Sequence, residues 1–211
     1  MVVTTRPIRV LCVDDHRLMR EGIARIVGVQ PDMMVVAEAS NGEHAVTQFL
    51  ASRPDVTLMD LQLPVTSGPE AIRRIRELDR SARIIVLTMY NGDEDVYRAF
   101  EAGAMGYVLK DTISDDLIHT IREVHAGRPV LTPEIQQVLD ERARLPILSV
   151  RERQVLELMA EGMRNKEIAA TLGISLDTAG MHVKHLFTKL EVHDRTAAVA
   201  KAIRRGIIHI Q

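Results

Sequence analysis

Short apolar runs alternate with amphipathic stretches along roughly the first 126 residues of the chain. Five of these runs have the length and composition of buried strands: 8–13, 34–39, 56–59, 83–88 and 106–109. The stretches between them repeat apolar residues at helical spacing, as Ala71, Ile72, Ile75 and Leu78 do. Apolar strands that alternate with helices predict an α/β, doubly wound five-stranded parallel sheet with helices on both faces.

The pattern changes after Gly127, where the strand signals stop and short helices with clear ends follow. Thr132 and Pro133 are typical of an N-cap and a first helical turn, which predicts a short linker helix that ends before Pro146. From residue 147 onward the sequence predicts four short helices, as in a small helix-turn-helix unit. Their expected N-caps are Ser149 (with Glu152 as a capping box), Asn165, Ser175 and Asp194, and their expected terminating glycines are Gly162, Gly173 and Gly206.

We therefore expect an α/β domain at residues 6–127, a linker with a short helix at 128–146, and a small all-α helix-turn-helix domain at 147–211. An apolar content of 46% in 211 residues is enough for two cores. The last segment, 147–211, has ten basic and seven acidic residues, whereas the preceding part has seventeen basic and twenty-two acidic residues. An acidic first part and a mildly basic last domain indicate a polyanionic partner for the latter.

Composition also excludes some classes of protein. The chain lacks an 18-residue apolar stretch and an N-terminal signal-peptide pattern, so we expect an unexported, cytoplasmic protein without a membrane partner. Cys12 is the single cysteine, which suits a reducing compartment. Aromatic residues make up 3% of the chain, which argues against base-stacking platforms for single-stranded nucleic acid.

Polar residues follow several of the predicted strands at the point where each strand ends. Asp14 and Asp15 follow the first strand, Asp60 the third, and Lys110 the fifth, while Thr88 ends the fourth. The carboxyl ends of parallel strands meet at one edge of the sheet, where such folds bind ligands. Alone, the Asp14-Asp15 pair would more often be a helix-capping turn, Thr88 and Lys110 would be surface residues, and Asp60 would be equally likely to be a loop residue. Together these residues predict a site for one Mg²⁺ and a phosphate.

This arrangement favours phosphoryl transfer to a carboxylate. A carboxylate held beside Mg²⁺ can attack phosphorus, while the metal and a lysine neutralise the charge that develops on the oxygens. Asp60 is the expected nucleophile, and Thr88 is placed to hydrogen-bond a phosphoryl oxygen. Lys110 and the metal would also offset the repulsion between Asp14 and Asp15.

The chain resembles the response regulators of the NarL/FixJ type, from about residue 6 to residue 208. The signature of their receiver domain is present as Asp14-Asp15, Asp60-Leu-Gln-Leu-Pro, Gly68-Pro-Glu-Ala, Leu87-Thr88 and Leu109-Lys110-Asp111. The resemblance implies a flavodoxin-like receiver fold, and one Mg²⁺ held by Asp14, Asp15, Asp60 and the backbone carbonyl of Gln62. It implies that Asp60 takes phosphate from a sensor histidine kinase, and that Thr88 and Tyr107 respond to it.

The last domain resembles the LuxR-type DNA-binding domain. The resemblance places the turn of the helix-turn-helix at 172–175 and the recognition helix at 176–190, in the major groove of double-stranded DNA. Ala179, Val183, Leu186 and Leu190 form one stripe that should pack inward. The predicted DNA contacts are Gly180, Met181, Lys184, His185, Thr188 and Lys189.

The same resemblance implies a homodimer in the active state, bound to an inverted-repeat operator. The last helix, 196–205, would make the dimer contact through Thr196, Ala197, Ala200 and Ile203, although a role in core packing stays open. Two positions depart from the family in a way that matters. Met89 is larger than the small residue common there, and Gly180 replaces a longer or charged side chain.

Three other interpretations compete with a phosphorylation-controlled transcription factor. An aspartate-nucleophile phosphatase would need a second Asp two residues after Asp60, where this chain has Gln62, so we expect no enzyme. A flavodoxin-like FMN protein would need a phosphate loop after the first strand, where this chain has Asp-Asp-His-Arg, so we expect no nucleotide cofactor. A receiver that dimerises without phosphate remains open.

Overall fold

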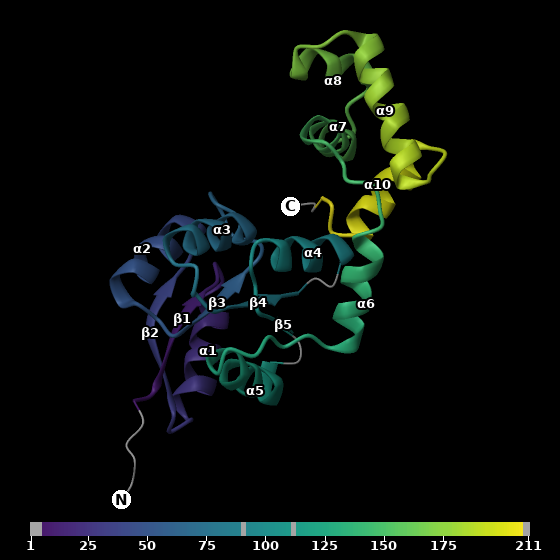
Figure 1. The fold of residues 1–211 in the computed structure, drawn as a ribbon. Helices are drawn as coiled ribbons and strands as arrows, with labels where there is room; N and C mark the ends of the chain where they lie inside the picture. The colour runs from purple at the N-terminus through teal and green to yellow at the C-terminus, as the bar shows by residue number, and fades with distance from the viewer. Residues whose placement is uncertain (1–5, 90–91, 111–112, 209–211) are drawn as a thin grey trace, which may run out of the picture. The chain divides into compact units, whose positions relative to one another are not determined.

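The computed structural model describes residues 6–89, 92–110 and 113–208, and it divides into two compact units (Figure 1). One unit comprises Met1–Tyr90 and Val96–Gln137, and the other comprises Asn91–Asp95 and Val138–Gln211. The first unit contains the parallel sheet, and the second contains the four helices of the predicted DNA-binding domain. Among the described residues, no helix is both long and apolar enough to span a bilayer.

The sheet confirms the predicted α/β class. Within the described residues it has five parallel strands in the order β2-β1-β3-β4-β5. The strands are β1 (Ile8–Val13), β2 (Met33–Ala39), β3 (Val56–Asp60), β4 (Ile84–Thr88) and β5 (Gly106–Leu109). Three ends differ by one residue from the sequence-based ranges. The most informative is that of β3, because Asp60 still pairs with Leu87 of β4 and is therefore the last strand residue.

Helices cover both faces of the sheet (Figure 1). They are α1 (Arg17–Gly28), α2 (Gly42–Ser52), α3 (Gly68–Leu78), α4 (Asp93–Glu101) and α5 (Ile113–His125). Alternate strand residues such as Val10, Leu58 and Leu87 form one core with Ile23 of α1 and Ile121 of α5. The intervening strand residues point to the opposite face, which α2, α3 and α4 cover.

The loop between β3 and α3 folds back tightly onto the end of β3. Gly68, the first residue of α3, donates its N–H to the carbonyl of Leu61 at 3.0 Å. A Cβ on Gly68 would lie 2.1 Å from the backbone oxygen of Asp60, so the close approach requires glycine. Gly68 thus helps to fix the position of the Asp60 backbone.

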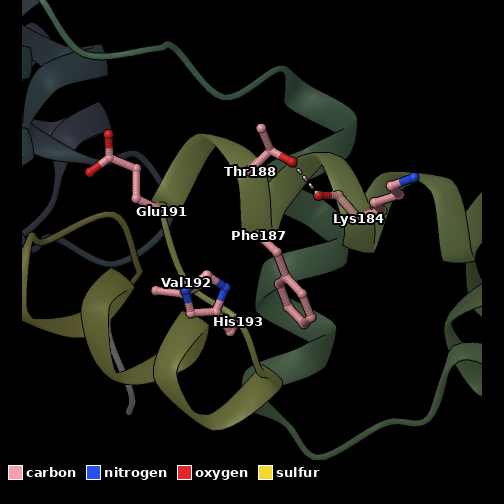
Figure 2. A pocket seen from close by; sticks show the side chains of 6 residues that line it. All are labelled: Lys184, Phe187, Thr188, Glu191, Val192 and His193. Carbon is pink, nitrogen blue, oxygen red and sulfur yellow. Dashed lines mark hydrogen bonds between the residues drawn. The ribbon is translucent and has the colours of Figure 1, made fainter.

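The second unit confirms the predicted helices and most of their ends. Its helices are α7 (Val150–Ala160), α8 (Asn165–Leu172), α9 (Leu176–Leu190) and α10 (Arg195–Arg204), and the linker helix is α6 (Pro133–Arg142). Ser149 and Glu152 form the expected capping box, and the side chains of Ser175 and Asp194 accept the expected N-cap hydrogen bonds. The helix α9 ends at Leu190, and its C-cap residue Glu191 adopts the left-handed conformation (φ 51°) before the turn to α10 (Figure 2).

The expectation that Asn165 caps the next helix is wrong. Arg164 is the N-cap residue of α8, and Asn165 is the first residue inside the helix. Glu167 fixes the start of the helix at Arg164. It lies three residues downstream, and its carboxylate accepts the N–H of Arg164 at 2.6 Å, as in a capping box.

The core of the second unit confirms the inward stripe of the recognition helix. Ala179, Leu186 and Leu190 are buried, and Val183 is partly buried against the same cluster. Val155, Leu156 and Ile168 of α7 and α8, together with Ala198 and Ala202 of α10, complete this cluster. The opposite face of α9 is thereby left toward solvent.

Candidate functional site

Asp14, Asp60 and Lys110 form a buried ion-pair cluster at the carboxyl edge of the sheet. The Lys110 ammonium lies 2.6 Å from Asp14 Oδ2 and 2.7 Å from Asp60 Oδ2. Asp14 is fully buried, Asp60 is 3% exposed and Lys110 is 9% exposed. One ammonium therefore bridges the acidic residues of two neighbouring strands, β1 and β3, as the predicted topology requires.

Burial and the contacts within the cluster act in opposite directions on the pKa values of Asp60 and Lys110. Burial raises the pKa of Asp60 above its ordinary value, although the hydrogen bond from Lys110 opposes that shift. The nearby Asp14 carboxylate raises the pKa of Asp60 further. Burial alone would lower the pKa of Lys110, but its hydrogen bonds to Asp14 and Asp60 outweigh this effect and raise the pKa. Lys110 therefore stays charged at neutral pH.

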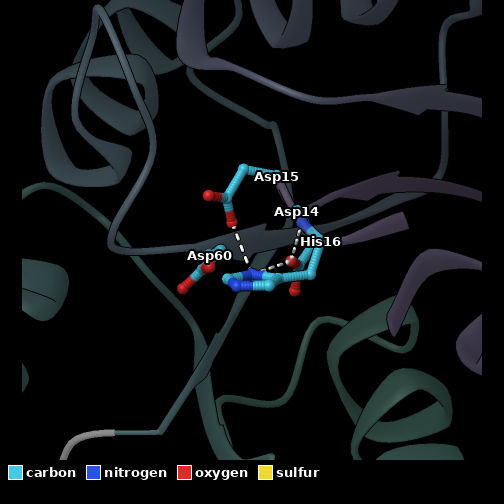
Figure 3. A group of neighbouring side chains, drawn as sticks. All are labelled: Asp14, Asp15, His16 and Asp60. Carbon is cyan, nitrogen blue, oxygen red and sulfur yellow. Dashed lines mark hydrogen bonds and ion pairs between the residues drawn. The ribbon is translucent and has the colours of Figure 1, made fainter. Parts of the chain in front are cut away.

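Asp15 and His16, from the loop after β1, lie beside Asp14 and Asp60 at the same edge of the sheet (Figure 3). The Nδ1 atom of His16 lies 2.7 Å from Asp15 Oδ1 and 3.4 Å from Asp14 Oδ1. The backbone N–H of His16 also donates to Asp14 Oδ1 at 2.8 Å. Sequence reasoning did not include His16 in the site, although it directly follows the Asp pair.

The residues present fit a divalent cation. Ligand atoms of Asp14, Asp15, His16 and Asp60 all lie within 4.8 Å of one another. The two buried carboxylates share one ammonium, so the buried cluster keeps a net negative charge, to which the partly exposed Asp15 adds. Carboxylate oxygens are the ligands that Mg²⁺ prefers. Gln62 donates its backbone N–H to Asp60 Oδ1 at 3.3 Å, and the role of its carbonyl as a ligand stays a prediction.

Thr88 and Tyr107 lie on neighbouring strands, and both are enclosed by the protein. Thr88, the last residue of β4, is 1% exposed, and Tyr107, in β5, is 7% exposed. Leu109 of β5 pairs with Thr88, and the Lys110 N–H donates to the Thr88 carbonyl at 2.9 Å. From the residues alone Tyr107 would be a half-buried strand residue; in this structure its ring is buried.

The solvent face of α9 holds most of the predicted DNA contacts. Met181 is 49% exposed, and Lys184, His185 and Thr188 are exposed as well. Apart from its chain neighbours and the nearby backbone of α9 itself, no described atom would lie within 4 Å of a Cβ on Gly180, so this position of the helix is open. These residues form one surface stripe, as the helical spacing predicted.

A shallow pocket of about 470 Å³ lies at the C-terminal end of this stripe. Figure 2 shows its lining residues, which come from the end of α9 and the following turn: Lys184, Phe187, Thr188, Glu191, Val192 and His193. Thr188 donates its hydroxyl to the Lys184 carbonyl at 3.1 Å. The pocket therefore belongs to the same surface as the predicted DNA contacts.

Lys189 occupies a different environment from its neighbours on α9. Its ammonium lies 2.7 Å from Glu152 Oε2 and donates to the carbonyl of Ile147 at 2.9 Å. Glu152 is 4% exposed and also accepts the N–H of Ser149 at 2.7 Å. Lys189 therefore links the end of the recognition helix to the start of α7, a tertiary contact that the sequence spacing does not reveal.

The four residues predicted for the dimer contact do not all lie on the exposed face of α10. Thr196, Ala200 and Ile203 are exposed and lie on one face, and Ile203 is 38% exposed. Ala197 is partly buried, and its N–H donates to the capping carboxylate of Asp194 at 2.8 Å. The inward face belongs to Ala198 and Ala202, so core packing and an exposed apolar face coexist on this helix.

Comparisons with known proteins agree with both halves of this arrangement. Residues 10–122 match the family described as "Response regulator receiver domain", and residues 146–202 match "Bacterial regulatory proteins, luxR family". The nitrate/nitrite response regulator NarL of Escherichia coli strain K12 is 37% identical over 201 residues, covering 91% of this chain and 93% of that protein. The response regulator VraR of Staphylococcus aureus strain COL is 36% identical over 206 residues, covering 95% and 99%.

Solved structures of response regulators also resemble this chain in fold. The response regulator ChrA, from a heme-sensing two-component system, is 36% identical with a TM-score of 0.57, over 97% of this chain and 100% of that one. A complex of the response regulator RcsB with DNA is 26% identical with a TM-score of 0.65, over 94% and 99%. The chain therefore belongs to the two-component response regulators that join a receiver domain to a luxR-family helix-turn-helix domain, and it is a DNA-binding transcription regulator.

Proposed function

We propose that Asp60 accepts a phosphoryl group from a partner histidine kinase with Mg²⁺ as cofactor, and that this controls dimerisation and DNA affinity. The receiver at 6–127 would hold the switch, the linker at 128–146 would connect it, and the domain at 147–211 would bind DNA. The observation that supports this most directly is the buried Asp60, which shares the Lys110 ammonium with Asp14.

Each side chain has a definite part in the transfer. A carboxylate oxygen of Asp60 forms the bond to phosphorus as the bond from phosphorus to the imidazole nitrogen of the kinase breaks. Lys110, at hydrogen-bond distance from Asp60, offsets negative charge on the phosphoryl oxygens, and the Thr88 hydroxyl donates a hydrogen bond to one of them. When bound to Asp14, Asp15, Asp60 and the Gln62 carbonyl, Mg²⁺ supplies further electrostatic stabilisation of those oxygens.

Intact-mass measurement after incubation with acetyl phosphate tests this assignment. We expect the wild type to gain one phosphoryl group in the presence of Mg²⁺ and to gain none with a chelator. Asp60→Asn should gain none, because an amide cannot act as the nucleophile. Asp116→Asn, which changes an exposed carboxylate on α5, is the matched control and should behave as the wild type. Equal uptake by Asp60→Asn would refute the assignment.

DNA binding by a dimer is supported by the second unit. The exposed stripe of α9 offers Met181, Lys184, His185 and Thr188 to a groove, with Lys184 as its main cation. RcsB, which resembles this chain over most of its length, has been solved as dimers bound to DNA. We therefore expect a homodimer on an inverted-repeat operator, with the exposed face of α10 (Thr196, Ala200 and Ile203, and the edge residue Ala197) at the dimer contact.

A further inference from the structure

His16 is the one nitrogen donor in the cluster of possible metal ligands found among the described residues. Its Nδ1 atom lies 2.7 Å from Asp15 Oδ1 and 3.4 Å from Asp14 Oδ1. Ligand atoms that share one cation at right angles, with bonds of about 2.1 Å, lie about 3 Å apart. The imidazole nitrogen pairs with these two carboxylates, and its distances from their oxygens are also close to those between neighbouring ligands of one cation (Figure 3).

The local structure explains why the ring takes this position. His16 is the N-cap residue of α1, and among the described residues its side chain makes no capping hydrogen bond to the helix. Its backbone N–H is held by Asp14 Oδ1, which fixes the turn directly after the Asp pair. The His16 ring therefore does not cap α1, and it faces the carboxylates of Asp14 and Asp15 instead. Its side chain is 74% exposed, which leaves room for it to adjust when a cation binds.

A nitrogen ligand changes which cation such a site prefers. Carboxylates and water suit Mg²⁺, whereas imidazole suits Zn²⁺ and other first-row transition metals, whose affinities also rise along the Irving–Williams order. We propose that His16 makes the receiver site of this protein bind Zn²⁺ and Co²⁺ through its imidazole, in competition with Mg²⁺. This inference rests on the proposed function, because it concerns the same site, and it assigns His16 as a determinant of metal specificity.

Calorimetric titration of the full-length protein with Mg²⁺, Zn²⁺ and Co²⁺ tests this inference. The variant is His16→Asn, since asparagine is a favoured N-cap residue and preserves the start of α1. The matched control is His44→Asn, which removes an exposed histidine of α2. We expect His16→Asn to weaken Zn²⁺ and Co²⁺ binding at this site by at least about tenfold, with Mg²⁺ affinity within about twofold, because Mg²⁺ relies on oxygen ligands. His44→Asn should match the wild type.

One further measurement, together with the phosphorylation assay described above, separates this inference from the proposed function. Nitrogen-15 NMR of the histidine rings should show a large Zn²⁺-dependent shift of His16 Nδ1, and Mg²⁺ should reverse it. Unchanged Zn²⁺ and Co²⁺ affinity in His16→Asn, or tighter binding of all three cations, would overturn the role of His16. If the wild type then still binds Mg²⁺ and takes phosphate on Asp60, the proposed function stands. If the wild type neither binds Mg²⁺ nor takes phosphate on Asp60, the proposed function is wrong, and the inference about His16, which rests on it, is wrong as well.

Discussion

At the scale of single residues, the partners of buried charges decide what each charge can do. Lys110 pairs with Asp14 and Asp60 at the edge of the sheet, where a phosphoryl group would arrive. Lys189 pairs with the buried Glu152 and so connects α9 to α7. Both are lysines near a predicted functional surface, but Lys110 lies where phosphoryl transfer is proposed, whereas Lys189 holds α9 against α7. We therefore expect Lys189 to contribute less to phosphate contact than Lys184.

Glu152→Gln should destabilise the DNA-binding domain at neutral pH. Burial of Glu152 favours its neutral form, but hydrogen bonds from Lys189 and Ser149 outweigh burial and lower its pKa. The folded pKa therefore lies below the unfolded value of about 4.3, and the stabilisation is present above that pH and is lost as the pH falls through the folded pKa. Loss of a charge-assisted, mostly buried interaction should cost about 1–3 kcal/mol.

Hydrogen exchange of the α7 and α9 amides in the full-length protein measures this effect without interference from the receiver. Exchange should be faster in Glu152→Gln than in the wild type at pH 7, and the difference should shrink near pH 3.5. Glu161→Gln, at the exposed C-cap of α7, is the control and should not change exchange. A difference between Glu152→Gln and the wild type that stays constant down to low pH would show that the charge of Glu152 is unimportant.

Met89→Ala should speed phosphoryl exchange at Asp60. Met89 directly follows Thr88 at the sheet edge and is 66% exposed, so its side chain can obstruct access without contributing to the core. A roughly threefold faster loss of phosphate corresponds to less than about 1 kcal/mol of barrier. Phosphate loss can be followed by intact mass after removal of the donor, with Leu18→Ala, another exposed apolar residue, for comparison. Slower loss in Met89→Ala would contradict this role.

At the scale of elements, hydrophobic periodicity predicted the five strands and the recognition helix, because buried faces impose period 2 or 3.6 on the sequence. It did not place the last residue of β3, because Asp60 is polar and yet its backbone continues the ladder to Leu87. Asn165 was misassigned as an N-cap, since Glu167 closes that helix end on Arg164. The Lys189–Glu152 pair and the position of the His16 ring depend on tertiary geometry and on a side-chain rotamer, which sequence spacing does not encode.

Gly180→Lys should strengthen DNA binding. Glycine inside a helix costs about 1 kcal/mol relative to alanine. Apart from its chain neighbours and the nearby backbone of α9, no described atom lies within 4 Å of the place where a Cβ of Gly180 would be. A lysine there would stiffen α9 and present a cation one turn before Lys184. With two recognition helices in a dimer, the slope of log affinity against log salt should steepen by about 2.

Gly180→Ala separates the two effects, because it stiffens the helix without adding charge. We expect it to stabilise the domain to a similar extent and to leave the salt slope unchanged. Fluorescence anisotropy with labelled duplex at several salt concentrations measures both variants. Loss of binding in Gly180→Lys, with the domain still folded, would instead show that the bare glycine permits a close approach to the groove.

At the scale of the whole molecule, an acidic receiver and a mildly basic DNA-binding domain share one chain, with a net charge of −5 for residues 1–146 and +3 for residues 147–211. A domain with so small a positive charge gains little from non-specific attraction to DNA. Two such domains on one operator double the number of phosphates that are neutralised. Dimerisation is therefore the step through which phosphorylation of Asp60 would most effectively change occupancy of DNA.

Phosphorylated protein should accordingly form dimers and bind an inverted-repeat duplex more tightly than unphosphorylated protein or Asp60→Asn. If a dimer neutralises about six to eight phosphates, the slope of log affinity against log salt should be roughly −5 to −7. Light scattering after size exclusion gives the oligomeric state, and anisotropy titrations give the slope.

Ile203→Asp, which places a charge on the exposed face of α10, should weaken binding to the inverted repeat and reduce the slope toward that of one half-site. Dimers of equal stability with and without phosphorylation of the protein would instead favour a receiver that dimerises constitutively. A salt slope near zero would rule out contacts to DNA phosphates as the main source of affinity.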